Sequence, residues 1–132
     1  MNNQEKNDLS PEPDEHHTED KQFEEITRLS KKGYKLLKNG HLEEARHIFE
    51  EGYELNNTNS YILIGLGDSI RKQKHFSESL PYYQRVLELD PNKRFALLGL
   101  GDAYRGLKDY ENSLNVWHRY IDSNPEDYSI LT

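Results

Sequence analysis

The chain contains no cysteine. Without thiols it can form neither a disulfide framework nor a thiolate metal site. Hydrophobic residues make up only 33% of its 132 residues, and the mean hydropathy is −1.04, so part of the chain must be highly solvated. No apolar run approaches the length that spans a membrane, and the N-terminus lacks the apolar core of a signal peptide. These absences lead us to expect a cytoplasmic protein with a single domain.

The formal net charge of −7 is concentrated near the N-terminus. Residues 1–22 have a net charge of −5, which leaves −2 for the rest of the chain. Pro11 and Pro13 interrupt this segment, and Leu9 is its only sizeable apolar residue after Met1. Such a segment buries too little apolar surface to offset its ordering entropy. We therefore expect residues 1–22 to form a disordered acidic tail, whose role the sequence leaves open.

The rest of the chain repeats itself with a period of 34 residues. Residues 63–68 read Leu-Ile-Gly-Leu-Gly-Asp, and residues 97–102 read Leu-Leu-Gly-Leu-Gly-Asp. A fixed period of this length indicates stacked helix–turn–helix units. Apolar residues at three- and four-residue spacing predict the helices, and polar or proline-containing turns separate them. We expect a repeat domain over residues 23–127, with units at about 26–59, 60–93 and 94–127 and the start of a truncated fourth unit at 128–132.

The spacing of small and large residues resembles that of the tetratricopeptide repeat (TPR) family. In the middle unit the family's signature columns hold Leu63, Leu66, Gly67, Ile70, Ser79, Tyr83, Val86 and Pro91. In the last unit they hold Leu97, Leu100, Gly101, Tyr104, Ser113, Trp117, Tyr120 and Pro125. The first unit departs from the pattern at Lys32 and Asn57. The resemblance covers about residues 26–127 and implies an all-α fold, a right-handed superhelix (α-solenoid) of three helix–turn–helix units.

The resemblance also implies a protein–protein interaction scaffold or adaptor that binds a peptide or helix of a partner on its concave face. The candidate partner-binding residues in this register are Tyr34, Tyr61, Ile64, Asp68, Arg71, Phe95, Leu98, Asp102 and Arg105. They suggest apolar anchors beside alternating charge, in a groove that Gly65 and Gly99 would deepen. The alternative is that the Asp–Arg pairs are ordinary helix-surface ion pairs and that the aromatic rings belong to the core. The sequence leaves both interpretations open.

One type of partner can be weighed against the residues. TPR domains that bind chaperone tails hold an acidic peptide with a carboxylate clamp of two lysines, two asparagines and an arginine. The corresponding positions here are Ser30, Tyr34, Gly65, Phe95 and Gly99. Because none of them matches, we expect no clamp of this kind, and a partner with apolar side chains and mixed charge instead.

Nothing in the sequence predicts an enzyme, a cofactor or a metal site. Gly65 and Gly67 lie within a predicted helix instead of following a strand, so they form no phosphate loop. The histidines lack the helical spacing of metal ligands. Two other functions stay open. One is self-assembly through a C-terminal face that the truncated fourth unit leaves uncovered. The other is RNA binding, which a basic stripe over residues 28–38 favours and the acidic tail opposes.

Overall fold

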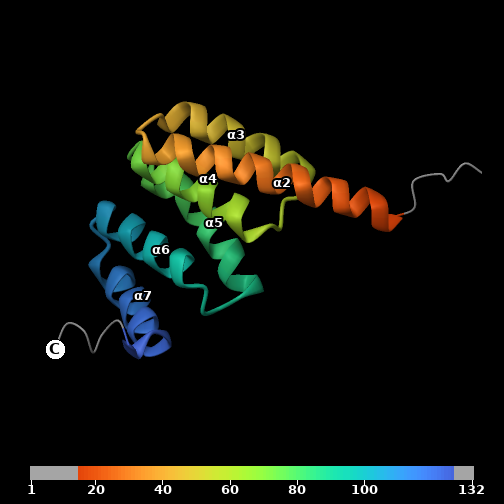
Figure 1. Cartoon of the computed structure of the whole chain (residues 1–132). Helices are drawn as coiled ribbons and strands as arrows, with labels where there is room; N and C mark the ends of the chain where they lie inside the picture. Colours follow the sequence, from red (N-terminus) through yellow and green to blue (C-terminus); the bar gives the residue numbers. More distant parts are fainter. Residues whose placement is uncertain (1–14, 127–132) are drawn as a thin grey trace, which may run out of the picture.

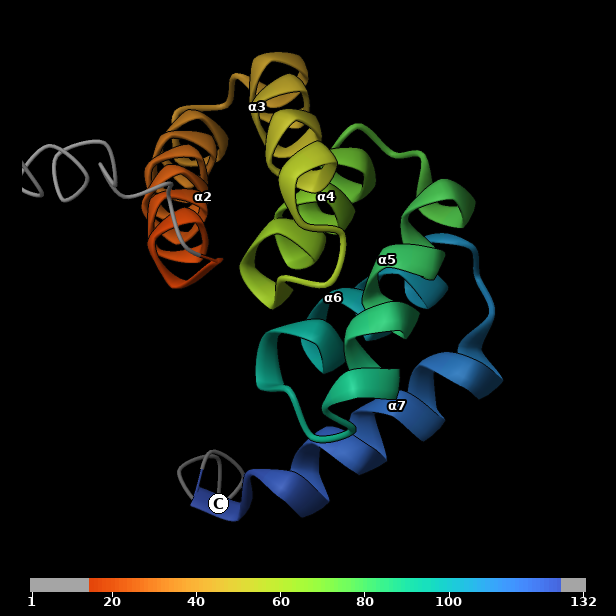
Figure 2. The ribbon, with the colours of Figure 1, turned by 90° about the vertical axis from the view of Figure 1, so that its right-hand side faces the viewer.

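The computed structural model of the chain describes residues 15–126, with side chains from Thr18 onward. Its α-helices are α2 (Glu15–Lys38), α3 (Leu42–Leu55), α4 (Ser60–Lys72), α5 (Phe76–Leu89), α6 (Arg94–Gly106) and α7 (Tyr110–Ser123). Consecutive helices pack in pairs, α2 with α3, α4 with α5, and α6 with α7 (Figure 1). Seen from the side, the pairs follow one another in chain order (Figure 2). The prediction of an all-α fold of consecutive helix–turn–helix units is confirmed.

Helix α2 begins at Glu15, inside the segment expected to be a disordered tail. That expectation is wrong for residues 15–22, and residues 1–14 lie outside the described residues. Residues 15–22 contain neither proline nor glycine, so a helix nucleated by the packed part of α2 can propagate through them. The amide of Gln22 also donates a hydrogen bond of 3.0 Å to the Leu55 carbonyl at the end of α3. The first turns of α2 extend beyond α3 (Figure 1). The expected fourth unit, at 128–132, lies outside the described residues.

The turn after the first helix of each pair contains a residue with a left-handed backbone, two positions beyond the end of the helix. Gly40 has φ 82°, Lys74 has φ 72° and Lys108 has φ 62°, and these positions are 34 residues apart. Glycine adopts such angles without steric penalty, whereas a residue with a Cβ atom is strained by about 1–2 kcal/mol. The second and third units thus place a lysine where glycine is favoured.

Large aromatic side chains fill the space between successive helix pairs. Phe49 of α3 and Tyr83 of α5 are both fully buried. Each ring lies against glycines in the neighbouring helices. A Cβ atom added to Gly65 would collide with the Phe49 ring, and one added to Gly99 would collide with the Tyr83 ring. The missing side chains of these two glycines therefore make room for buried rings, and do not deepen an open groove as the sequence suggested.

None of the helices between residues 15 and 126 combines the length and the apolar character needed to cross a membrane.

Candidate partner-binding groove

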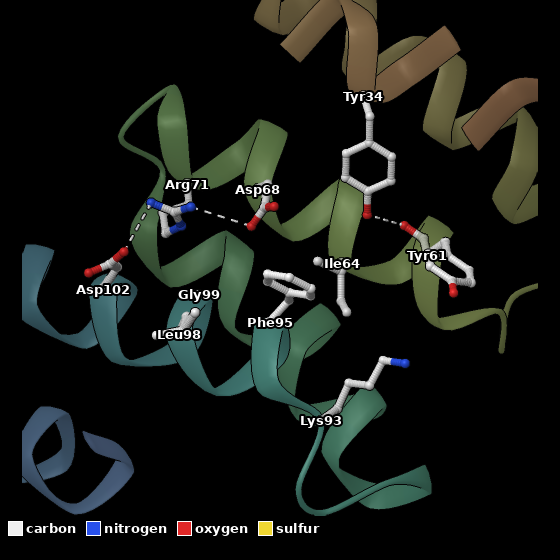
Figure 3. Close-up of a pocket in the computed structure, with 10 residues that line it drawn as sticks. All are labelled: Tyr34, Tyr61, Ile64, Asp68, Arg71, Lys93, Phe95, Leu98, Gly99 and Asp102. Atoms are coloured by element: carbon white, nitrogen blue, oxygen red, sulfur yellow. Dashed lines mark hydrogen bonds and ion pairs between the residues drawn. The ribbon is translucent and has the colours of Figure 1, made fainter. Parts of the chain in front are cut away.

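A groove of about 620 Å³ lies between α4 and α6, with α2 along one side (Figure 3). Its walls come from the first helix of each pair, as the repeat register predicts. The lining residues are Tyr34, Tyr61, Ile64, Asp68, Arg71, Lys93, Phe95, Leu98, Gly99 and Asp102. Eight of the nine predicted residues are thus brought together, and the ninth, Arg105, lies next to the groove and pairs with Asp102. The volume is within the range of about 300–1,000 Å³ that is usual for ligand-binding clefts.

Two aromatic rings stand at one end of this groove. Tyr61 is 62% exposed and Phe95 is 60% exposed, so neither ring belongs to the core. The ammonium of Lys93 lies 5.5 Å from the centroid of the Tyr61 ring, within cation–π distance. Ile64 is buried beneath this end and Leu98 is half-buried, so the floor of the groove is apolar.

Tyr34 fastens α2 to the Tyr61 end of the groove. Its hydroxyl donates a hydrogen bond of 2.7 Å to the backbone carbonyl of Tyr61 (Figure 3). Its ring meets the ring of Phe49 edge to face, with the centroids 5.0 Å apart. Burial raises the pKa of the Tyr34 phenol, and the nearby charge of Asp68 raises it further. The hydroxyl therefore remains a donor at neutral pH.

A polar network occupies the other end of the groove and joins three helices. The Tyr83 hydroxyl, from α5, donates a hydrogen bond of 2.6 Å to Asp68 and accepts one of 3.0 Å from Arg71. Arg71 also lies 3.4 Å from Asp68 and 3.6 Å from Asp102 of α6. Arg105 in turn pairs with Asp102 at 3.1 Å. The carboxylates and guanidinium groups are therefore parts of one network across two units, and not separate pairs on single helices.

Burial sets the protonation of this network. It raises the pKa of the Asp68 carboxyl, although the hydrogen bond from Tyr83 and the charge of Arg71 act in the opposite direction. Burial also raises the pKa of the Tyr83 phenol, and the charge of Asp68 raises it further. The phenol stays protonated at neutral pH and serves as the donor to Asp68.

Two further residues line the groove: Gly99, which the sequence suggested would deepen it, and Lys93, which the sequence did not indicate. Gly99 contributes only backbone to the groove wall, because its missing side chain makes room for Tyr83. Lys93 occupies the N-cap position of α6, where its side chain makes no capping hydrogen bond. The equivalent residue 34 positions earlier, Asn59, caps α4 by accepting a hydrogen bond from the Ile62 amide. A lysine where a capping residue is favoured is a signal that could have indicated Lys93.

A metal site would need several His, Asp or Glu side chains close together. Between residues 18 and 126, no group of three His, Asp or Glu side chains is placed to hold a metal ion.

Comparisons with solved structures support the fold. The Arabidopsis OM64 TPR domain matches with a TM-score of 0.75 and 17% identity, over 79% of this chain and 86% of that one. The first TPR of Spaghetti (RPAP3), bound to HSP90 peptide SRMEEVD, matches with a TM-score of 0.74 and 20% identity, over 77% and 81%. MamA from Desulfovibrio magneticus RS-1 matches with a TM-score of 0.70 and 24% identity, over 76% of this chain and 57% of that one.

Sequence comparisons name the family. No curated protein sequence gives a significant match. Two family models, both described as tetratricopeptide repeat, match residues 60–93 and 95–127. These matches leave out the first unit, where the sequence departs from the pattern at Lys32 and Asn57. The two models together match half of the chain, and its helices form consecutive helix–turn–helix pairs as the family's repeats do. The chain therefore belongs to the tetratricopeptide repeat family, whose domains are generally protein–protein interaction modules.

Proposed function

We propose that the groove binds a peptide or helix of a partner protein, with an apolar side chain of the partner held between Tyr61 and Phe95. The observation that carries this proposal is the exposure of both rings, 62% and 60%, above an apolar floor. Aromatic side chains in a concave, apolar site are among those on which binding energy most often concentrates. Water leaves both rings when an apolar partner side chain enters, which favours binding.

The groove walls are held in place before a partner arrives. Tyr34 joins α2 to α4 through the Tyr61 carbonyl, and Arg71 joins α4 to α6 through Asp102. A preformed site loses little conformational entropy on binding, so that cost falls mainly on the partner. The groove therefore supports recognition of a short segment that orders as it binds.

The likeness to the Spaghetti TPR suggests comparison with its HSP90 peptide, which has an acidic end. The positions expected to correspond to a carboxylate clamp here carry no cation. Gly65 and Gly99 are packed against buried rings, so they present no side chain to a peptide. We therefore propose that this groove does not hold a chaperone tail by such a clamp, and that it takes a partner with apolar side chains and mixed charge.

Removing both rings is the direct test. Peptides would first be selected on the wild-type chain from a displayed random dodecapeptide library. The double variant Tyr61→Ala/Phe95→Ala is expected to bind the most enriched peptide about 100-fold more weakly, since each anchor contributes about 1–2 kcal/mol. Its Tm should stay within about 3 °C of wild type, because exposed side chains contribute little to folding. Affinity is measured by fluorescence anisotropy and Tm by circular dichroism.

Tyr110→Ala is the matched control, because this ring is 59% exposed on α7, away from the groove. It should leave the affinity unchanged. Equal weakening by Tyr110→Ala, or a large fall in Tm for the double variant, would contradict the proposed role of the groove. A library that yields no enriched peptide would contradict it as well.

A second candidate function, self-assembly, is favoured by the surface of α7. Tyr110 and Leu114 are 59% and 57% exposed there, and among α2–α7 this helix packs only against α6. We expect light scattering after size-exclusion chromatography to show a molar mass that rises with concentration, and Leu114→Asp to abolish the rise. A constant monomer mass up to about 1 mM, where even weak contacts form, would rule this function out.

A further inference from the structure

A second pocket continues the groove beyond Asp102. It has a volume of about 360 Å³ and is lined by Arg71, Lys72, Lys74, Phe76, Asp102, Arg105 and Gly106. Arg71 and Asp102 line both cavities, so the two cavities are adjacent and meet at this ion pair. Four of the seven lining residues are cationic and one is anionic. We call this cavity the basic pocket.

The two arginines of the basic pocket are already paired with carboxylates of the chain. Arg71 pairs with Asp68 and Asp102, and Arg105 pairs with Asp102. Lys72 and Lys74, in contrast, form no ion pair with any residue between 18 and 126. The pocket therefore has positive charge that the described part of the fold does not neutralise by direct pairing. A ligand carboxylate here would gain both Coulomb energy and hydrogen bonds.

Lys74 is held in a backbone conformation that disfavours lysine. Its φ of 72° corresponds to that of Gly40 in the first unit, where no side chain is strained. The side chain of Lys74 lines the basic pocket, whereas that of Lys108, which has φ 62°, does not.

We infer that the partner segment carries one or two Asp or Glu side chains that contact Lys72 and Lys74, in addition to its apolar anchor. This inference rests on the proposed function of the groove. Along α4, Lys72 lies eight residues beyond Ile64, the floor residue beneath the two rings, which corresponds to about 12 Å at the helical rise. An extended peptide covers that distance in about three to four residues. The expected partner motif is therefore an aromatic or large aliphatic residue with an acidic residue three or four positions away.

The selection from the dodecapeptide library tests this motif directly. Enriched peptides should contain an acidic residue three or four positions from an apolar one. The most enriched peptide and its counterpart with Gln and Asn in place of Glu and Asp then serve as the two probes. The acidic probe is expected to bind about tenfold more tightly at low ionic strength, with a smaller difference at 0.5 M salt, because salt screens exposed charges.

Variants of the lysines separate a binding role from a structural one. Lys74→Gly should weaken binding of the acidic probe about threefold, and Lys72→Gln/Lys74→Gly about tenfold, with no change for the neutral probe. Lys74→Gly should not lower Tm, because glycine accepts the positive φ. Lys108→Gly is the matched control, with the same backbone change outside the pocket, and should leave both affinities unchanged.

Each alternative gives a different result. Suppose that Tyr61→Ala/Phe95→Ala abolishes binding, that the lysine variants bind the acidic probe as tightly as the wild-type chain does, and that the wild-type chain binds the two probes equally. The groove function then stands and the acidic motif is wrong. If no peptide is enriched, the groove function itself fails. If a single-stranded RNA oligomer displaces the acidic probe stoichiometrically, the basic pocket is a phosphate site and the inference is overturned. A dimer that shields Lys72 and Lys74 from the probe would overturn it too.

Discussion

Replacing Tyr83 with alanine is expected to lower the free energy of unfolding by about 3–5 kcal/mol, the usual effect of removing a buried aromatic ring. The side chain is fully buried between Gly67 and Gly99, so its loss leaves a cavity between two units. Urea unfolding followed by circular dichroism gives the value. Tyr82→Ala is a control in the adjacent, half-buried residue and should have a smaller effect. Equal effects of the two variants would contradict the central position of Tyr83.

Tyr83→Phe separates the hydroxyl from the ring. It should cost about 1–3 kcal/mol, because Asp68 and Arg71 lose a buried partner. The hydrogen bond from Tyr83 lowers the pKa of Asp68, so its loss should raise that pKa further above the ordinary value. Because the pKa of Asp68 is raised in the folded state, the folded chain holds this proton more tightly than the unfolded chain does. The stability that the protonated carboxyl contributes is therefore present at low pH and is lost as the pH rises through the folded-state pKa. Carboxyl chemical shifts of Asp68 measure the change, and an unchanged pKa would exclude the hydroxyl from the network.

Gly99→Ala is expected to lower the free energy of unfolding by about 1–3 kcal/mol, in spite of alanine's higher helix propensity. The new methyl group would meet the Tyr83 ring, which is buried and has no room to move. Gly101→Ala, in the same helix, is the matched control. Its methyl group would lie 3.0 Å from the nearest atom of Trp117, a half-buried side chain that can shift.

The two glycine variants should therefore differ in sign or by more than about 1 kcal/mol, because Gly101→Ala keeps the propensity gain of about 1 kcal/mol and needs only a small shift of Trp117. Thermal and urea unfolding measured under one set of conditions give both values. Gly99→Ala more stable than Gly101→Ala would show that the Tyr83 ring moves freely, contrary to its complete burial.

Periodicity was sufficient to predict the helix pairs and which helices form the groove. The spacing of 34 residues aligns Tyr61 with Phe95 and Ile64 with Leu98, and each pair lies in the groove wall. A repeat register transfers geometry from one unit to the next, so residues far apart in sequence can be assigned to one surface.

Periodicity could not predict contacts that depend on the packing of three helices. Asp68 and Arg71 have the spacing of a helix-surface pair, and nothing in α4 indicates that Tyr83 of α5 completes the network. The repeat register places Gly65 on the inner face of α4, but it does not show that the buried Phe49 ring packs against this glycine.

The sequence alone did not predict that α2 begins at Glu15. The composition of residues 15–22 shows how little apolar surface they can bury, but it does not show that the packed helix after them can extend through them.

Tyr34 makes the first unit differ from the other two along the groove. It stands 34 residues before Asp68 and 68 before Asp102, so it is the first unit's counterpart of those two groove residues. Where they leave space, its ring packs against Phe49 and its hydroxyl reaches the Tyr61 carbonyl. The Tyr34 ring thus occupies space between α2 and α4, whereas the corresponding space between α4 and α6 is the open groove. The repeat is therefore asymmetric along this face, and we expect the proposed groove to hold one segment per chain.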